Sequence, residues 1–229
     1  MKLTQAIPYP DWSFLYPPRP EKAILPSLIP SFETRGWVSQ YKLNGTCTFI
    51  GVDPQGGLHT LTRHNTPHKM WKPSERTKAL AAFCPRGQWT VFIAELLNDK
   101  TPLIKDTLYL FDIIVSSSLQ LVGTTFQERQ DFLSELMFPK GIQDPKSNWW
   151  EKSPEKSHAV VAPGIWLAKT QRTGLRDIFT QIRDAGDKSV EGLVLKDPKG
   201  VLEYAYRAGS NQGWQCKCRV ALPNSHMGF

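Results

Sequence analysis

The 229-residue sequence predicts an α+β fold in which antiparallel strands are flanked by helices. Short runs rich in β-branched and aromatic residues alternate with turn residues, which is typical of antiparallel strands. Two other segments repeat apolar residues at helical spacing. The hydrophobic content of 40% suits a packed core. We divide the chain into a proline-rich N-terminal arm, residues 1–34, and a folded domain, residues 35–229.

Prolines dominate the arm, and seven of the 18 prolines lie in residues 1 to about 30. Because proline fixes φ and lacks an amide donor, we expect neither a regular helix nor a central strand there. Trp12, Phe14, Leu15 and Tyr16 nevertheless supply apolar anchors. We therefore predict an extended arm that packs along the body of the protein.

The strands begin after the arm. Residues 37–42 and 46–52 read as strands joined by a tight connection, Leu43-Asn44-Gly45, in which Asn and Gly would accept a positive φ. A turn at residues 54–57 and a strand at 58–63 complete an antiparallel meander. Further strand-length runs are residues 89–97, 107–115, 192–196, 201–206 and 213–220.

Three helices are predicted. Ser74 can cap a short helix that runs through Phe83. Thr125 and Glu128 form a capping-box pattern in front of an apolar stripe. The helix from Leu175 has apolar residues at i, i+3, i+4 and i+7 and can end at a glycine. Residues 139–157 read as a polar loop.

Composition narrows the classes of function. The net charge of +7 and the pI near 9.2 suit a polyanionic partner such as a nucleic acid or a nucleotide, although a merely basic protein remains an alternative. The four cysteines match no metal-binding spacing, so we expect free, buried thiols in a reducing compartment. The chain shows no signal peptide and no apolar run of membrane-spanning length. We therefore expect a soluble, cytoplasmic protein.

Lys42 is the candidate nucleophile. It ends a short apolar strand and precedes Asn44 and Gly45, which would hold its ammonium at the mouth of a cleft. A lysine that is desolvated beside other cations has a lowered pKa, and its free amine is a usable nucleophile. The alternative is a surface lysine at a hairpin.

Charged residues inside other apolar strands support the hypothesis that Lys42 belongs to an active site. Glu95 lies within such a run and needs a cation, a hydroxyl or a metal as partner, or forms a salt bridge with an arginine. Glu191 and Lys196 differ in parity, so they share a pocket only if the strand bends at a residue such as Gly192. Lys217 and Arg219 lie two residues apart in one strand, so a phosphate bound between them would relieve their repulsion. Tyr109 and Phe111 also share a strand face, and their rings could stack on a base or belong to the core.

Over about residues 35–220, these stretches in this order resemble the nucleotidyltransferase motifs of ATP-dependent DNA and RNA ligases and mRNA capping enzymes. Lys42 to Gly45 resembles the motif with the adenylated lysine, and Glu95 resembles the acid of a later motif. The other similar positions are Arg63, Phe111 in Leu-Phe-Asp-Ile, Thr125 to Arg129, Glu191 to Lys196, and Lys217 with Arg219.

The resemblance implies an ATP-grasp-like nucleotidyltransferase domain. Lys42 would attack the α-phosphorus of ATP, and the AMP would pass to a 5′-phosphate end before a 3′-hydroxyl seals the strand. Glu191 would hold Mg²⁺ or Mn²⁺, and Glu95 would hold the ribose hydroxyls or a metal. The implied catalytic cations are Lys196, Lys217 and Arg219, and the implied nucleotide-binding residues are Gln40, Tyr41, Asn44, Gly45, Arg63, Glu95 and Phe111.

The chain departs from the family pattern in three places. Asn44 replaces the usual aspartate, and Cys47 stands where an arginine is common. The chain also ends soon after Arg219, which leaves no room for the usual OB-fold domain, so we expect a minimal ligase, a partner protein that supplies the clamp, or AMP transfer without closure on DNA. The leading hypothesis is a ligase that seals nicked duplex DNA. RNA ligation, mRNA capping and a noncatalytic nick-binding module are the alternatives.

Overall fold

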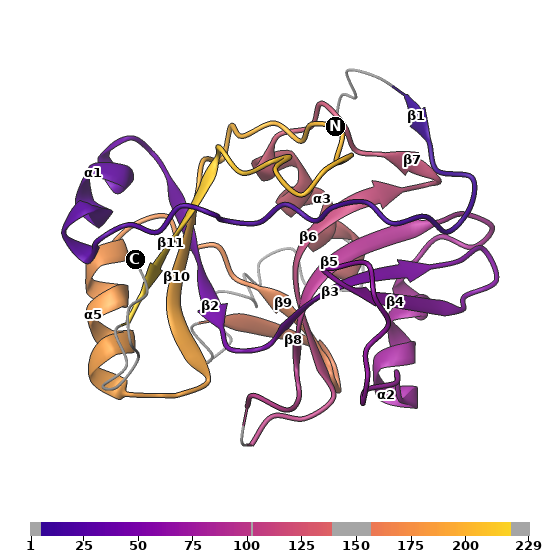
Figure 1. The fold of residues 1–229 in the computed structure, drawn as a ribbon, viewed down its shortest axis with the longest axis horizontal. Coiled ribbons are helices and arrows are strands. Elements are labelled where there is room, and N and C mark those ends of the chain that lie inside the picture. Colours follow the sequence, from indigo (N-terminus) through magenta and orange to yellow (C-terminus); the bar gives the residue numbers. More distant parts are fainter. Residues whose placement is uncertain (1–5, 102, 139–156, 221–229) are drawn as a thin grey trace.

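The chain folds into two sheets with helices around them, as a computed structural model shows for residues 6–101, 103–138 and 157–220 (Figure 1). In the larger sheet, the strand order is β1-β7-β6-β5-β3-β4, with β9 parallel to β6 and β8 beside β9. The smaller sheet has the order β11-β10-β2 and is antiparallel. The larger sheet comprises β1 (Ile7–Pro8), β3 (Thr46–Val52), β4 (Leu58–Thr62), β5 (Thr90–Leu97), β6 (Thr107–Ser116), β7 (Leu119–Gln120), β8 (His158–Ala162) and β9 (Ile165–Ala168). The smaller sheet comprises β2 (Val38–Leu43), β10 (Val190–Lys196) and β11 (Gln215–Arg219).

The connection between β2 and β3 differs from the predicted turn. β2 pairs with β10 in the small sheet, whereas β3 pairs with β4 and β5 in the large one, so the chain changes sheets at Asn44 and Gly45. Neither residue has a positive φ. Gly45 is required for a different reason, because an added Cβ would lie 2.5 Å from the Leu96 carbonyl oxygen and 2.6 Å from Glu95 Cγ.

The helices follow the capping signals. α2 (Glu75–Lys78) starts at the Ser74 cap and continues as the 3₁₀ helix η2 (Ala79–Phe83), and α3 (Phe126–Met137) has the complete Thr125 capping box. α5 (Leu175–Ala185) ends at Gly186, whose φ is +62°. The short α1 (Ile29–Thr34), preceded by η1 (Pro26–Leu28), corrects the expectation that the arm has no regular helix, because each begins with a proline in its first turn, where proline is tolerated.

The small sheet buries one face against α5 and α1. Alternate residues of its strands and the apolar stripe of α5 form this core, and each fully buried aliphatic or aromatic side chain contributes about 1.5–3 kcal/mol. The four cysteines are free, as predicted, but only Cys216 and Cys218 are buried, in this core, whereas Cys47 and Cys84 are partly buried. The core includes Tyr41, Leu43, Phe179, Ile182, Leu193, Leu195, Cys216 and Cys218.

The N-terminal arm runs across both sheets, as predicted (Figure 1). The Trp12 ring covers Gly51 of β3 so closely that an added Cβ there would lie 2.1 Å from the ring. Further along, Ile24 donates to the Lys217 carbonyl at 2.9 Å, and Lys217 donates to the Lys22 carbonyl at 2.9 Å. The arm therefore adds itself to the free edge of β11.

One expected strand needs correction, two strands were missed, and one expected loop lies outside the described residues. Residues 201–206 form no strand, because Leu202 instead exchanges backbone hydrogen bonds with Gly123 and Thr124. The short strands β8 and β9 were not predicted. The predicted loop at 139–157 lies outside the described residues except for Ser157. Within the described ranges, no helix has the length and apolarity that a membrane crossing requires.

Candidate active site

One face of the small sheet carries half of the predicted site residues. Gln40 and Lys42 are two residues apart in β2, so their side chains share a face. Val194 of β10 pairs with Gln40 on one side and with Lys217 of β11 on the other, which places Lys217 and Arg219 on that same face. The opposite face is the core against α5. The alternation of the strands thus separates a polar site face from an apolar packing face.

A β-bulge brings Glu191 onto the site face. The register between β10 and β2 shifts between Val190 and Gly192, and Gly192 has a φ of +137°. An added Cβ at Gly192 would lie 2.1 Å from the Cys218 carbonyl oxygen, so only glycine fits. The bulge lets Glu191 and Lys196 face the same side despite their opposite parity. It confirms the bend predicted at Gly192.

Glu191 lies between two cations. Its Oε2 atom is 2.7 Å from Lys42 Nζ and 3.2 Å from Arg219 Nε. The side chains of Lys42 and Glu191 are 18% and 22% exposed, so their ion pair is largely shielded but open to a ligand. Because the carboxylate contacts the ammonium directly, it is placed both to orient Lys42 and to accept its proton.

Glu95 approaches this cluster from the large sheet. Its Oε1 accepts a hydrogen bond from the Gly45 amide at 3.1 Å, and Lys100 Nζ donates to the Gly45 carbonyl at 2.7 Å. Burial raises the pKa of Glu95 to about 7. The nearby Glu191 raises this pKa further, while Lys42 lowers it. Glu95 therefore changes charge near neutral pH, in contact with the glycine that follows the Lys42 strand.

A buried polar network continues the site toward the interior. Lys196 Nζ donates to Gln40 Oε1 at 2.7 Å, Gln40 Nε2 donates to Gln130 Oε1 at 2.9 Å, and Gln130 Nε2 donates to the Phe111 carbonyl at 3.0 Å. Lys196 Nζ also lies 5.1 Å from the centre of the Phe111 ring and 4.5 Å from that of Phe126. Burial lowers the pKa of Lys196 to about 8, because the ammonium is desolvated. Phe111 is partly exposed and so has ring surface left for a ligand.

Arg63 and Cys47 lie at the outer side of the site. The Arg63 amide donates to the Cys47 carbonyl at 3.2 Å, and Cys47 pairs with Glu95 across β3 and β5. The Arg63 side chain is exposed. Burial raises the pKa of Cys47 to about 12, so this thiol stays neutral where the family pattern commonly has an arginine.

Lys217 completes the basic wall of the site. Burial lowers its pKa, because the ammonium loses solvent. The cations of Arg219, Lys42 and Arg19 lower this pKa further, while Glu21 raises it. Several cations therefore repel one another around Lys217, and an anion such as a phosphate would relieve this repulsion.

Two predicted site residues have other positions. The Tyr41 ring lies in the core on the opposite face, and its carbonyl accepts a hydrogen bond from the Tyr109 hydroxyl at 3.3 Å. Asn44 anchors the sheet-changing connection: its amide donates to the Ser189 carbonyl at 2.8 Å, and its Nδ2 donates to the Lys188 carbonyl at 3.3 Å. An aspartate could not donate the second bond, which gives a local reason for the asparagine.

Sequence reasoning missed four residues of the site. Arg19 reaches it from the arm, Lys100 from the loop after β5, and Gln130 from α3, and none of these has a local sequence signal. Val194 could have been found, because strand alternation places it on the face of Lys196.

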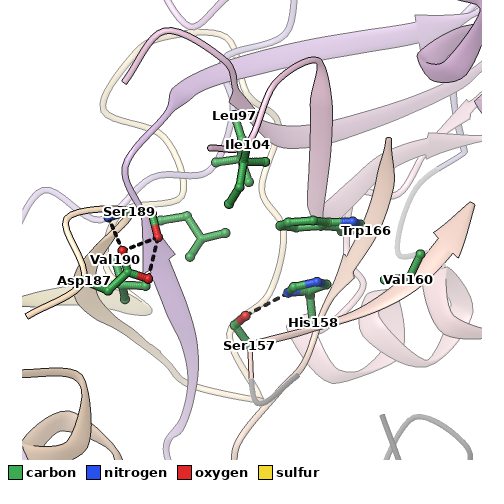
Figure 2. Close-up of a pocket in the computed structure, with 10 residues that line it drawn as sticks. Leu97, Ile104, Ser157, His158, Val160, Trp166, Asp187, Ser189 and Val190 are labelled. Carbon is green, nitrogen blue, oxygen red and sulfur yellow. Dashed lines mark hydrogen bonds between the residues drawn. The ribbon is translucent and has the colours of Figure 1, made fainter. Parts of the chain in front are cut away.

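A separate cavity of about 370 Å³ lies beside the ends of β2 and β10 (Figure 2). The His158 and Trp166 rings stack in it at 3.7 Å, and Ser189 Oγ donates to the Asp187 carboxylate across from them. None of the predicted site residues lines this cavity. Its lining residues are Leu43, Leu97, Ile104, Ser157, His158, Val160, Trp166, Asp187, Ser189 and Val190.

Glu95 and Glu191 are the two carboxylates available for a divalent metal. Among the described residues, no cluster of three or more acidic, histidine or cysteine side chains forms a metal site. Two carboxylates suit Mg²⁺, which is commonly held by one or two protein carboxylates together with water and substrate phosphates. Burial is the main cause of the raised pKa of Glu95, and a bound cation would relieve the smaller repulsion by Glu191 that adds to it.

Comparison with known proteins identifies the fold. No protein-family model and no curated protein sequence matches the chain. Among solved structures, the ligase domain of M. tuberculosis LigD matches with 15% identity and a TM-score of 0.56, over 90% of this chain and 58% of that one. A mycobacterial DNA ligase D complexed with ATP and MES matches with 16% identity and a TM-score of 0.51, over 80% and 54%.

This chain therefore spans little more than half the length of these two structures. At such identity, the likeness shows the fold alone. The fold is that of the catalytic domains of ATP-dependent ligases, with curved antiparallel sheets flanked by helices, and the predicted fold class is confirmed.

Proposed function

We propose that this chain is an ATP-dependent polynucleotide ligase that seals 5′-phosphate/3′-hydroxyl nicks in DNA through a lysyl-AMP intermediate on Lys42. The observation that carries the proposal is the 2.7 Å contact between Lys42 Nζ and the Glu191 carboxylate, on a fold shared with ligase catalytic domains. It supports a lysine held in place for covalent chemistry beside an acid and further cations.

In the first step, Lys42 acts as the nucleophile. Its ammonium passes a proton to Glu191, and the free amine attacks the α-phosphorus of ATP. The new N–P bond forms as the P–O bond to pyrophosphate breaks, which leaves a phosphoramidate. Lys217 and Arg219 lie on the same sheet face, where their charges would stabilise the negative charge that develops on the phosphates.

In the next two steps, the AMP is transferred and released. An oxygen of the 5′-phosphate attacks the phosphorus of lysyl-AMP, and the N–P bond breaks as a pyrophosphate linkage forms. The 3′-hydroxyl then attacks the 5′-phosphate, loses its proton, and expels AMP as the strand is joined. Arg63 is exposed at the outer side of the site, where a strand end would arrive.

The nucleotide base would lie over the inner part of the site face. Phe111 offers partly exposed ring surface, and Val194 lies on the facing strand between Gln40 and Lys217. Glu95 would hold the ribose hydroxyls or share with Glu191 a Mg²⁺ or Mn²⁺ ion. Such a metal, when bound, neutralises phosphate charge in phosphoryl transfer.

A sealing assay tests this function. Purified protein is incubated with ATP, Mg²⁺ or Mn²⁺, and matched nicked duplexes with a DNA or an RNA nick, and the products are separated on denaturing gels. We expect a joined DNA strand that depends on ATP and on the 5′-phosphate and is absent with Lys42→Ala. Joining of the RNA nick alone would assign an RNA ligase, and joining of neither would contradict the proposal.

A further inference from the structure

Three segments that are distant in sequence meet beside the Lys42 site and enclose a small cavity of about 250 Å³. They are the arm, the turn after β4, and the loop between β10 and β11. The arm and the β10–β11 loop are joined by a hydrogen bond from the Tyr16 amide to the Ala205 carbonyl at 3.2 Å. The cavity is lined by Tyr16, Pro17, Arg19, Arg63, His64 and Ala208.

The cavity contains two guanidinium groups. Arg63 Nε donates to His64 at 3.1 Å, and no carboxylate pairs with Arg63 in the part of the chain that the structure describes. Arg19 pairs with Glu21 at 2.6 Å, and this glutamate is itself exposed. A guanidinium has donors enough to bind a phosphate as well as one carboxylate. The cavity is therefore suited to an anion.

Exposed aromatic rings lie on the loop that contributes Ala208 to the cavity. The side chains of Tyr204 and Tyr206 are 43% and 63% exposed, and their rings lie nearly parallel, with centroids 6.0 Å apart. Arg207 lies 5.3 Å from the centre of the Tyr206 ring. Tyrosine rings usually pack into a core or an interface, whereas these two stay exposed among the residues that the structure describes. They belong to the stretch that was predicted to be a strand.

The arm and the β10–β11 loop are anchored to the protein by residues other than Arg19, Tyr204 and Tyr206. The loop is held by Leu202 and Ala205, which are buried in the main core. The arm is held on one side by Trp12 over β3 and on the other by the backbone pairing of Ile24 with β11. Arg19 and the two tyrosines are thus presented by a fixed backbone without contributing to its core.

We propose that the arm–loop surface, formed by Arg19, Arg63, His64, Tyr204, Tyr206 and Arg207, binds a nucleic-acid strand with unpaired bases. The inference rests on the proposed function for the class of the partner, a nucleic acid. Arg19 and Arg63 bind backbone phosphate in the cavity, and the tyrosines stack on bases. The rings select unpaired bases, because bases inside a duplex have no free face for an aromatic side chain. The arm is therefore part of the binding surface and has more than the packing role expected of it.

Binding is measured by fluorescence anisotropy on the full chain carrying Lys42→Ala, so that no chemistry occurs. The two probes are a blunt duplex and a duplex with a single-stranded overhang, matched in phosphate number. We expect tighter binding to the overhang and at least about fivefold weaker overhang binding with Tyr206→Ala, while Tyr206→Phe keeps the affinity. Equal binding of both probes, or an unchanged affinity in Tyr206→Ala, would overturn the proposal.

The phosphate contact is measured by the salt dependence of binding. Arg19→Ala is expected to reduce the slope of log K against log salt by about one. The matched control is Arg86→Ala, which removes the same charge from an exposed loop at the far end of the β3–β4 hairpin. If both variants change the slope equally, Arg19 has no specific contact and the proposal fails. Circular dichroism melts confirm that each variant is folded.

These binding results are independent of the proposed ligase activity. A wild-type protein that forms lysyl-AMP but shows no dependence on Arg19 or Tyr206 would retain the proposed function and refute the surface. A protein that forms no lysyl-AMP but whose binding depends on Arg19 and Tyr206 would support the surface and refute the proposed function.

Discussion

The buried ion pair between Arg129 and Asp112 allows a quantitative test of how α3 is fixed to β6. Two hydrogen bonds join the side chains at 2.8 and 3.1 Å, and Arg129 also donates to the Thr124 carbonyl at 2.9 Å. Both side chains are almost completely buried, at 0% and 1% exposed. Arg129→Met would leave the Asp112 carboxylate with the Ile113 amide as its remaining donor, at 2.9 Å. Such an unpaired buried charge costs about 3–5 kcal/mol.

The assay is urea unfolding of the wild type, the two single variants and the double variant. In parallel thermal melts of a chain of this length, a loss of about 3–5 kcal/mol lowers Tm by roughly 6–20 °C. In Asp112→Leu/Arg129→Met, neither member of this ion pair is left buried without its partner, so most of the stability is expected to return. A loss below about 1 kcal/mol in Arg129→Met, or a double variant no more stable than the single one, would refute this reasoning.

Three changes at the Lys42 site have defined outcomes. Glu191→Gln removes the proton acceptor 2.7 Å from Lys42 and is expected to slow lysyl-AMP formation by about 100-fold or more in single-turnover labelling; a rate within threefold of wild type would exclude that role. The pKa of Glu95 is raised to about 7, so its carboxylate forms as pH rises through that value, and the wild-type rate of AMP addition should rise with it. Glu95→Gln should remove this pH dependence, and a profile unchanged in the variant would contradict the assignment. Asn44→Asp replaces a donor to the Lys188 carbonyl with an acceptor and is expected to lower the free energy of unfolding by about 1 kcal/mol in urea melts, whereas an unchanged midpoint would mean that this bond contributes nothing.

Strand alternation predicts much of the site. The opposite parity of Glu191 and Lys196 predicts a bend at Gly192, and the structure has a bulge there. The same rule argues against a nucleotide-binding role for the Tyr41 side chain, because a residue adjacent to Lys42 in a strand points to the opposite face of the sheet. The contribution of Arg19 could not be predicted, because it depends on the path of the arm across both sheets.

The remaining differences arise from tertiary contacts. Residues 201–206 have strand-forming composition, but Leu202 and Ala205 are the buried pair, and a spacing of three does not fit the period of two in a strand. Asn44 and Gly45 suit a hairpin by composition, yet β2 finds its partner in β10, far along the chain. Only the folded chain shows that Gly45 is needed for its close approach to Glu95.

The most direct test of the account is covalent labelling of Lys42. The purified protein is incubated with ATP labelled at the α-phosphate and with Mg²⁺ or Mn²⁺, and is then analysed by denaturing electrophoresis and intact mass. Prior treatment with pyrophosphate removes any AMP that was already bound during purification. The account predicts one AMP per chain, labile to acid and absent in Lys42→Ala. An adduct that persists in Lys42→Ala, or no adduct in the wild type, would contradict it.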